Sequence, residues 1–543
     1  APRGDAPARM RRRYPSMPPL PPSDHDPRRR GGDSLPSEFD RVVLADPPEG
    51  PPRDPGNGFT RVIALVATVA LVAAVVAMQF AGRNGGLATA PSAEIDPPDL
   101  QMILMGRMAM GIEALSEAAG QSGSAAATSN AQQLMSQLDS LAEGGPAREW
   151  VRGAVVAAEL EGVEKAAERL DEAEEALAII EEQTAGDASL DEDRAKAELT
   201  RVETLRADIE TLRAIYAAGS ADAADIPQTD RDGLVDRHGY FGEVALAYGL
   251  DSSDPARKDV LGAGMRTMVT LVAAFTIGAL ALLAGFVLAV VALIRGMSRR
   301  GLRRRYAPPS FGGSVYLETF ALFLLGFIAV SILAGALSSY TSFPVEYVLV
   351  WVLLLVPFWP RLRGQPRANN KHALGWTRGE GIVKEVFAGV VGYLALLPLF
   401  LVGVLATILL GFLFAMVEKA LGREPPEPMT HPIMEQLVGG DLKTLLLLLS
   451  LAAVWAPLVE ETLFRGAFFH HLRGRWGVLM SSFVTGFVFA VIHPQGFAAV
   501  PALMSLGFSF ALLREWRGSL IAPITAHAMH NGFLVTMLWL ALS

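Results

Sequence analysis

Long uninterrupted hydrophobic runs divide the chain and predict about nine membrane-spanning helices. The first run, Val62 to Phe80, has about 20 residues, the length that an α-helix needs to cross a hydrocarbon core. The other eight follow one another toward the C-terminus: 268–294, 316–337, 345–359, 383–416, 445–468, 478–492, 497–513 and 519–542. The run 383–416 is long enough to contain an interfacial turn. The pattern therefore predicts an all-α fold, a polytopic transmembrane helical bundle.

A different pattern occupies the long interval between the first two runs, where apolar residues recur at helical spacing among many acidic ones. The apolar positions take steps of four, three, four, three and seven, which is typical of a short helical hairpin or coiled coil: Val156, Leu160, Val163, Ala167, Leu170 and Leu177. The interval therefore predicts an extracytoplasmic helical domain inserted between two spans. Its simplest role is that of a solvated acidic bundle that contacts partners or substrates outside the membrane.

The distribution of charge orients these spans. The formal net charge is −9, but Glu94 to Asp259 carries −21 and the rest of the chain carries +12. Basic residues concentrate on the cytoplasmic side of membrane proteins, and arginine clusters before the first span and at 295–305 flank the acidic interval. We therefore expect the N-terminus inside and the acidic domain outside. The clusters at 11–14 and 28–30 fit attraction to anionic lipid better than nucleic-acid binding.

Five regions follow from hydropathy and charge: a disordered, basic and proline-rich cytoplasmic tail (1–59), a transmembrane helix (60–82), an acidic helical extracytoplasmic domain (83–265), transmembrane helices (266–425) and a transmembrane core (426–543). The composition, 51% hydrophobic and 19% charged with a mean hydropathy of +0.31, excludes a disordered or fibrous protein. We expect an integral, multi-pass protein of the cell (plasma) membrane. The absence of cysteine excludes disulfides, thiolate zinc sites and cysteine nucleophiles.

Ionisable residues inside apolar spans are costly and mark functional sites, and this chain places several near its C-terminus. In the segment LAAVWAPLVEETLFRGAFF, Glu461 and Arg465 stand four apart and share a helix face, where they can form an ion pair. Glu460 lies about 100° away on the helix and lacks this partner, which leaves it available as a general base. Pro457, one turn earlier, removes a backbone hydrogen bond and can open the helix near the site.

Two further spans add histidines and an amide. His493 ends one span, and His527 and Asn531 stand four apart on one face of the last span. Each residue alone has an ordinary structural explanation, as a helix cap or an ion pair, but the combination in three neighbouring spans favours a polar pocket within the bilayer. Imidazole and carboxylate groups suit zinc, and a glutamate beside such a site can activate water. With the predicted span boundaries, Glu460 lies toward the cytoplasmic end of its span and His493 at the external end of its own. The two can therefore converge only if one of these span boundaries is misplaced.

These residues occur in three short motifs that resemble those of a known family. Glu460 to Arg465 (EETLFR) matches EExxxR, Phe489 to His493 (FAVIH) matches FxxxH, and His527 to Asn531 (HAMHN) matches HxxxN, in the same order and approximate spacing. The chain is thus similar to the CPBP family, the CAAX prenyl protease 2 and bacteriocin-processing Abi group of intramembrane proteases. The resemblance covers about residues 440–543, within the transmembrane core.

The resemblance implies a conical helical fold whose polar chamber cleaves peptide bonds. It implies these roles: Glu460 as the water-activating base, Glu461 and Arg465 as support, His493 and His527 as metal ligands or oxyanion donors, and Asn531 as an aid to His527 or the oxyanion. It also implies a divalent metal cofactor, with zinc as the first candidate and Glu460, His493 and His527 as its ligands. His530 is an extra candidate ligand outside the motif, whereas His470 is expected at the cytoplasmic end of its helix.

The leading hypothesis is an intramembrane endopeptidase that hydrolyses a peptide bond of a membrane-associated or peptide substrate with glutamate-activated water and histidine or metal assistance. Two alternatives use the same residues: a proton-coupled membrane transporter, and a non-catalytic membrane scaffold or immunity protein. A transporter is expected to show inverted repeats, and the two halves of the sequence show none. Expected partners are a peptide or protein substrate at the membrane, the lipid bilayer and a protein that binds the acidic domain; no nucleic acid is expected.

Overall fold

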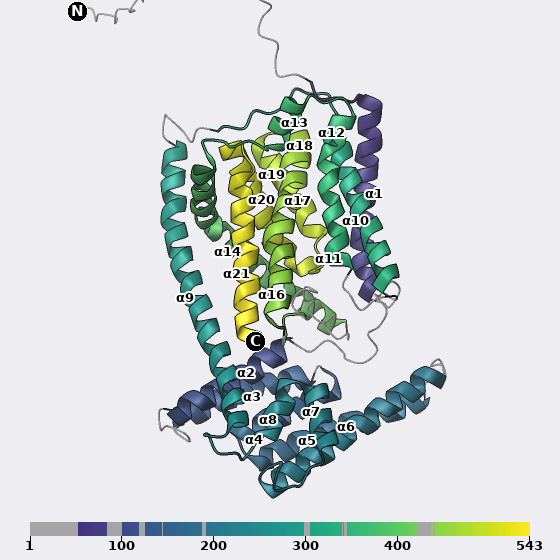
Figure 1. The fold of residues 1–543 in the computed structure, drawn as a ribbon, viewed down its shortest axis with the longest axis vertical. Coiled ribbons are helices and arrows are strands. Elements are labelled where there is room, and N and C mark those ends of the chain that lie inside the picture. Colours follow the sequence, from purple (N-terminus) through teal and green to yellow (C-terminus); the bar gives the residue numbers. More distant parts are fainter. Residues whose placement is uncertain are drawn as a thin grey trace, which may run out of the picture. The chain divides into compact units, whose positions relative to one another are not determined.

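The computed structural model describes residues 53–83, 100–118, 125–143, 145–186, 192–297, 304–338, 340, 345–421, 436–438 and 440–543. Within these ranges the regular structure is entirely helical, so the predicted all-α fold is confirmed (Figure 1). The predicted disordered tail lies outside the described residues up to position 52.

All nine predicted hydrophobic segments contain helices. Six helices in the described part of the chain are long and apolar enough to cross a membrane: Gly58–Gln79, Pro255–Met297, Val315–Leu337, Ile382–Ala420, Leu442–Arg473 and Phe497–Arg517. Tyr347–Leu362 and Val478–Val491 are shorter apolar helices. The last helix, α21 (Ile521–Leu542), has 22 residues and carries the polar HxxxN motif. The bundle is therefore polytopic, as predicted.

The membrane elements other than α21 are α1 (Gly58–Arg83), α9 (Pro255–Met297), α10 (Val315–Ser338), α11 (Glu346–Leu349), η2 (Val350–Phe358), α12 (Trp359–Leu362), α13 (Arg367–Leu374), α14 (Ile382–Ala420), α16 (Leu442–Leu449), η3 (Ser450–Trp455), α17 (Ala456–Glu460), η4 (Glu461–Phe468), α18 (Phe469–Arg473), α19 (Val478–Val491), η5 (Phe497–Ala499) and α20 (Val500–Arg517). Helix α14 continues through Pro398 for 39 residues without the interfacial turn that its length allowed. Helix α19 has only 14 residues, so it is about 21 Å long and shorter than a hydrocarbon core of about 30 Å.

The two ends of the bundle differ in charge and contacts. At one end several of the arginines that follow the spans form ion pairs, and Arg517 reaches both Glu380 (2.9 Å) and Glu385 (2.8 Å). At the other end Arg107 of the acidic region donates a hydrogen bond to the carbonyl oxygen of Ser543 (3.1 Å). The cytoplasmic placement of the basic end and the external placement of the acidic domain stay predictions from the sequence.

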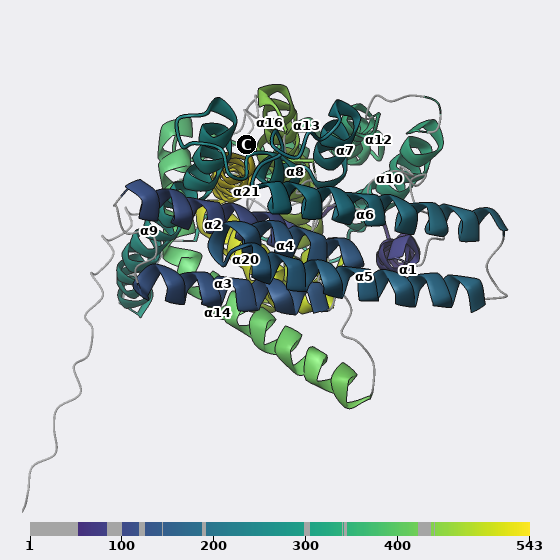
Figure 2. The same cartoon turned by 90° about the horizontal axis from the view of Figure 1, so that it is seen from below.

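The acidic region folds into a helical domain of seven helices among its described residues: α2 (Leu100–Ala118), α3 (Ala125–Glu143), α4 (Ala147–Leu160), α5 (Val163–Gly186), α6 (Glu192–Ala218), α7 (Gln228–His238) and α8 (Tyr240–Leu246). Helices α3, α4, α5 and α6 pack in sequence order, and Figure 2 shows them from below. The predicted seam is divided between α4 and α5, which meet in a hairpin at Gly162, whose φ of 97° favours glycine. Val156 and Leu170 are buried, whereas Val163, the first residue of α5, is exposed.

A buried polar cluster joins α6 to α7 inside this domain. Arg237 donates a hydrogen bond to Oδ2 of Asp208 (2.7 Å), and Nε2 of His238 lies 3.1 Å from the same oxygen. Burial disfavours the Asp208 carboxylate, but the hydrogen bonds from His238 and Arg237 outweigh it and hold the pKa of Asp208 below its ordinary value. Burial lowers the pKa of His238, whose Nδ1 has no hydrogen-bond partner. The cluster is therefore stable with Asp208 charged and His238 neutral.

Helix α9 connects the helical domain to the membrane bundle without a break over 43 residues, or about 65 Å. In the domain it approaches α2 closely, because a Cβ atom at Gly111 would lie 2.6 Å from the carbonyl oxygen of Gly264. In the bundle it approaches α14 closely, since a Cβ atom at Gly285 would overlap the carbonyl oxygen of Leu394. Small residues at both places let the backbones touch.

The described end of the tail packs against the basic end of the bundle. The backbone N–H groups of Ser314 and Val315 donate to the carbonyl oxygen of Pro55 (3.0 and 3.1 Å). Oδ2 of Asp54 lies 3.1 Å from Nε2 of His470 in α18. The chain before α1 is therefore fixed against α10 and α18 from residue 53 onward.

Candidate active site

The residues of the EExxxR motif lie on a helix with two π-helical segments. Glu460 ends the short helix α17, and Glu461 begins the π-helical segment η4; a second π-helical segment, η3, precedes α17. Pro457 lies between the two segments and has no N–H to donate to the preceding turn, as the sequence predicted. Irregular turns of this kind often accompany functional sites because they change the direction in which side chains point.

Two histidine side chains from different parts of the chain approach Glu460. Its Oε2 atom lies 3.9 Å from Nε2 of His493, beyond α19, and 3.9 Å from Nε2 of His527 in α21. The Oε2 atom is buried and accepts no hydrogen bond. The structure therefore brings together the predicted base and both predicted histidines. The sequence had placed Glu460 and His493 toward opposite ends of their spans. The structure brings them to one depth, because Glu460 lies near the middle of the helical run Leu442–Arg473 and α19 is short.

The second glutamate orients His527. Nδ1 of His527 lies 2.9 Å from Oε1 of Glu461, and because a carboxylate accepts hydrogen bonds, Nδ1 is the donor. This fixes the ring with Nε2 toward Glu460. The ring of Phe510 in α20 stacks on the imidazole at 5.1 Å with an interplanar angle of 22°. A carboxylate behind a functional histidine is a frequent way to fix its tautomer and orientation.

His493 is oriented by its own helix end. Its Nδ1 donates a hydrogen bond to the carbonyl oxygen of Phe489 (2.5 Å), and its ring packs on the Phe489 ring at 4.3 Å. The carbonyl oxygen of Ile492, the residue before His493, accepts a hydrogen bond from Nε2 of Gln79 in α1 (2.7 Å). Carbonyl groups at a helix C-terminus lack partners within the helix, so Gln79 caps the end of α19 beside His493.

Glu461 and Arg465 form the predicted ion pair, and both side chains are 0% exposed. Nη1 of Arg465 donates to Oε1 of Glu461 (2.8 Å), and Nη2 donates to the carbonyl oxygen of Gly507 (2.9 Å). The guanidinium also lies 4.7 Å from the ring centroid of Phe489 and 5.2 Å from that of Phe510. These contacts supply the attraction that a charge needs inside a low-dielectric bundle.

The remaining polar residues of the motif region point elsewhere. Nδ2 of Asn531 donates to the carbonyl oxygen of Ala452 in η3 (2.8 Å), so Asn531 contacts the irregular helix rather than His527 in this structure. Nδ1 of His530 lies 3.0 Å from the hydroxyl group of Tyr393 in α14, away from Glu460. His470 lies in α18 at the basic end, as predicted.

The arrangement has the donor types of a zinc site but not the spacing. Ligands around a tetrahedral zinc ion at 2.0–2.1 Å stand about 3.3 Å apart. The carboxylate oxygen and the imidazole nitrogens here are separated by 3.9 Å. In the part of the chain that the structure describes, no group of three histidine or acidic side chains has the arrangement of a metal site. A single water molecule can, however, span each of these 3.9 Å separations with hydrogen bonds of about 2.8 Å.

Sequence reasoning missed three contributors to this site: the ring of Phe510, the carbonyl group of Gly507 and the side chain of Gln79. Gln79 carried a signal, because it is a polar residue near the end of an apolar span. Phe510 and Gly507 carried none, since an apolar residue in an apolar span is ordinary.

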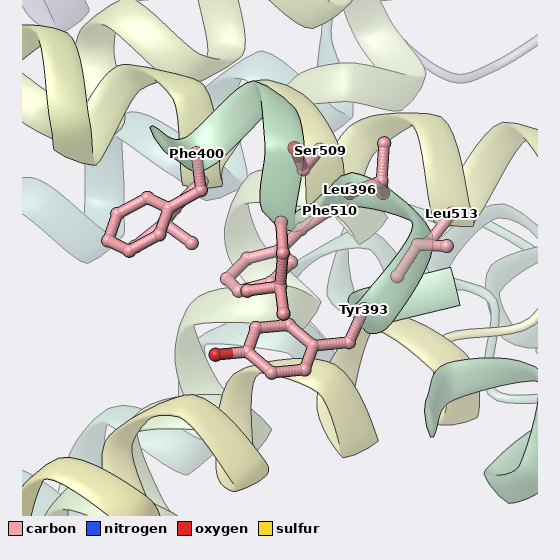
Figure 3. A pocket seen from close by; sticks show the side chains of 8 residues that line it. Tyr393, Leu396, Phe400, Ser509, Phe510 and Leu513 are labelled. Carbon is pink, nitrogen blue, oxygen red and sulfur yellow. The ribbon is translucent and has the colours of Figure 1, made fainter. Parts of the chain in front are cut away.

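A small apolar pocket adjoins the site between α14 and α20. Phe510 forms part of its wall together with Tyr393, Leu396, Phe400, Ser509 and Leu513 (Figure 3). Because Phe510 also stacks on His527, one aromatic ring separates this pocket from the polar centre. The pocket itself contains none of the motif residues.

Fold and site together define a polytopic membrane protein with a polar centre of glutamate and histidine. Residues 442–533 match the family model of type II CAAX prenyl endopeptidase Rce1-like proteins. The chain is 32% identical over 89 residues to the membrane-embedded CAAX protease MroQ of Staphylococcus aureus (strain USA300), across 15% of this chain and 36% of the relative. It is 31% identical over 132 residues to an uncharacterized 24.3 kDa protein of Escherichia coli, across 23% of this chain and 58% of that relative. No solved structure matches the chain significantly.

The matching segment contains all three motifs, so the resemblance to the CPBP family is confirmed for the C-terminal helices. The protein is an integral, multi-pass membrane protein. The chain spans 36% and 58% of the lengths of these two relatives. The helices before residue 442 lie outside the family match.

Proposed function

We propose that the protein is an intramembrane endopeptidase that hydrolyses a peptide bond of a membrane-associated protein or peptide. One observation carries this proposal: a buried carboxylate oxygen of Glu460 that accepts no hydrogen bond faces Nε2 of both His493 and His527 at 3.9 Å. A buried carboxylate without a partner is costly, and a water molecule held between the three groups would satisfy it. That water is the nucleophile of the proposed reaction.

In the proposed reaction Glu460 accepts a proton from this water while the water oxygen bonds to the peptide carbonyl carbon. The carbonyl oxygen becomes an oxyanion in the tetrahedral intermediate. Glu460 then gives the proton to the peptide nitrogen as the C–N bond breaks, and the carboxyl and amine products separate. One residue thus serves as base and then as acid, so no second acid is required.

His527 is suited to stabilise the oxyanion. Water can donate only two hydrogens, so one of the three groups that face it must itself be a donor. A proton on Nε2 of His527 would be balanced by Glu461, whose carboxylate lies 2.9 Å from Nδ1 of the same ring. The resulting N–H would point toward the reacting carbonyl in a site walled by Phe489 and Phe510, where electrostatic stabilisation is strong.

The divalent metal remains a prediction, because the donor atoms stand too far apart to share a tetrahedral zinc ion in this structure. Chelation of the purified protein followed by addition of zinc tests it directly. Activity that survives chelation would favour the water-based mechanism above; loss with recovery on zinc addition would require the three side chains to move together around the ion.

The substrate class is part of the proposal. The S. aureus relative is named a CAAX protease, which suggests prenylated C-terminal peptides as one arm of a substrate panel and unprenylated peptides as the other. A protein partner for the helical domain remains a prediction from the sequence.

The decisive experiment uses the full chain in lipid nanodiscs with this panel, and compares the wild type with Glu460→Gln and His527→Gln. His530→Gln is a matched control, because His530 lies in the same helix but faces Tyr393. We expect cleavage by the wild type and the control and none by the other two. Equal cleavage in all four would refute the proposal, and Glu460-dependent proton flux without cleavage would establish the transporter alternative.

A further inference from the structure

Three arginines gather around the loop 309–313 at the basic end of the bundle: Arg53, Arg61 and Arg475. Arg53 and Arg61 both donate hydrogen bonds to the carbonyl oxygen of Gly312 (3.4 and 2.8 Å). The guanidinium carbons of Arg61 and Arg475 lie 5.1 and 4.9 Å from the ring centroid of Phe311. Arg53 precedes α1, Arg61 lies in α1 and Arg475 lies in the loop after α18, so only the folded chain brings the three arginines together.

None of these arginines forms an ion pair with a carboxylate within the described ranges. Asp54, which is closest in sequence, is occupied by Gln365 (3.1 Å) and His470 (3.1 Å). Nε of Arg61 is buried and has no hydrogen-bond partner. Like charges repel across short distances, so three guanidinium groups around one loop favour binding of an anion.

The side chain of Arg475 is exposed at the edge of a small pocket. This pocket is lined by Asp54, Gly312, Gly313, His471 and Gly474, and the Asp54 carboxylate in it is already bound to His470. Glycines leave the backbone accessible, and α10 begins just after the loop at Val315, which adds the positive end of a helix dipole. The site therefore combines three arginines with the N-terminal end of a helix at the surface of the bundle.

The position of the cluster indicates which anion it meets. Helices α1 and α10 both begin here, so the loop lies at the level where spans enter the bilayer. Phe311 is 64% exposed and Trp476 is 44% exposed, and exposed aromatic residues at span ends are typical of the membrane interface. At the cytoplasmic interface the abundant anions are phospholipid headgroups.

We propose that Arg53, Arg61 and Arg475 bind the phosphate of an anionic membrane phospholipid, with Phe311 beside the glycerol region of that lipid. Guanidinium groups match phosphate geometry with paired N–H donors, and lysine does not. The proposal is independent of proteolysis, because the cluster includes no residue of the active site.

The test is native mass spectrometry of the full chain in detergent, titrated with phosphatidylglycerol, phosphatidylcholine or inorganic phosphate. We expect Arg61→Gln combined with Arg475→Gln to weaken phosphatidylglycerol binding about 25-fold, since each basic residue near an anionic surface contributes roughly fivefold. Arg378→Gln is the control for the loss of one surface charge, matched to Arg475→Gln alone, because Arg378 is exposed at the same end and lies outside the cluster. It should change binding less than twofold.

Arg475→Gln alone covers the case in which the double variant misfolds, because the Arg475 side chain is exposed and makes no hydrogen bond. It should weaken binding about fivefold by the same arithmetic. Unchanged binding in these variants, or an equal loss in Arg378→Gln, would overturn the proposal. Competition by millimolar inorganic phosphate as strong as that by the lipid would assign the site to free phosphate instead.

Discussion

The same substitution, Glu to Gln, should have different effects on stability at the adjacent positions Glu460 and Glu461. Glu460→Gln should abolish cleavage and leave stability unchanged or slightly higher, because its Oε2 atom is buried without a hydrogen bond. Glu461→Gln should lower stability, because it removes the counter-charge of the fully buried Arg465. A purely structural role for both glutamates would predict similar effects on stability.

The magnitudes follow from these contacts. General acid–base catalysis contributes about 10²- to 10⁴-fold, so Glu460→Gln should raise the activation barrier by about 2.7 to 5.4 kcal/mol. Removal of one partner of a buried ion pair costs about 3 to 5 kcal/mol, which is the expected loss for Glu461→Gln. Catalysis should also fall in Glu461→Gln, since His527 loses its charged acceptor.

The assay pairs peptide cleavage with thermal unfolding in detergent, followed by the fluorescence of the eight tryptophans. Stability separates the two variants, because cleavage alone would fall in both. The reasoning would be refuted if Glu461→Gln unfolded at the wild-type temperature, or if Glu460→Gln unfolded as early as Glu461→Gln while it still cleaved peptide.

Three further predictions concern positions away from the motif. Gln79→Leu should lower kcat by about 2- to 13-fold with little change in KM, because it removes a hydrogen bond worth about 0.5–1.5 kcal/mol behind His493. Thr68→Val is the control and should leave kcat unchanged, since the Thr68 hydroxyl donates to Ala64 in its own helix. Gly486→Ala should cost about 1–3 kcal/mol of stability, because its Cβ would lie 2.7 Å from backbone atoms of α20; Gly411→Ala, with open space around it, is the control in the same thermal assay. Acidification from pH 7 to 5 should destabilise the helical domain, because the lowered pKa of His238 means that the unfolded chain, with a pKa of about 6.5, takes up a proton that the folded domain does not. Asp208, also with a lowered pKa, adds a loss of the same sign at lower pH; amide hydrogen exchange should show this pH dependence in the wild type and a weaker one in His238→Gln.

The features that sequence predicted are those decided by local spacing and by the cost of burying charge. Glu461 and Arg465 pair because they share one helix face, and two buried opposite charges have a lower free energy together than apart. The helices themselves follow from hydrophobic runs in a medium that cannot hydrogen-bond to the backbone. The convergence of Glu460, His493 and His527 was predicted from three motifs in neighbouring spans, and the structure places them together.

What the sequence did not predict depends on which helices are neighbours. Hydrophobic periodicity identifies the buried face of a helix but not the residue across from it, so the stacking of Phe510 on His527 was not foreseen. The contact between Gln79 and Ile492 joins positions 413 apart in the chain, and no local pattern encodes it. Asn531 shows the same limit, because its spacing placed it near His527 while the π-helical segment η3 offered the carbonyl group of Ala452 instead.

The unbroken helix α9 gives the protein a mechanical property. Glycine contacts clamp it at both ends, to α2 through Gly264 and to α14 through Gly285, and it also packs on α21, which carries His527. A continuous helix resists bending, so α9 couples the helical domain to the membrane bundle rigidly rather than through a flexible linker. A force that tilts the helical domain, such as the binding of a large protein outside the membrane, is therefore transmitted to the helices that enclose the polar centre. For the proposed endopeptidase, a protein bound to the helical domain would then act on the polar centre through α9.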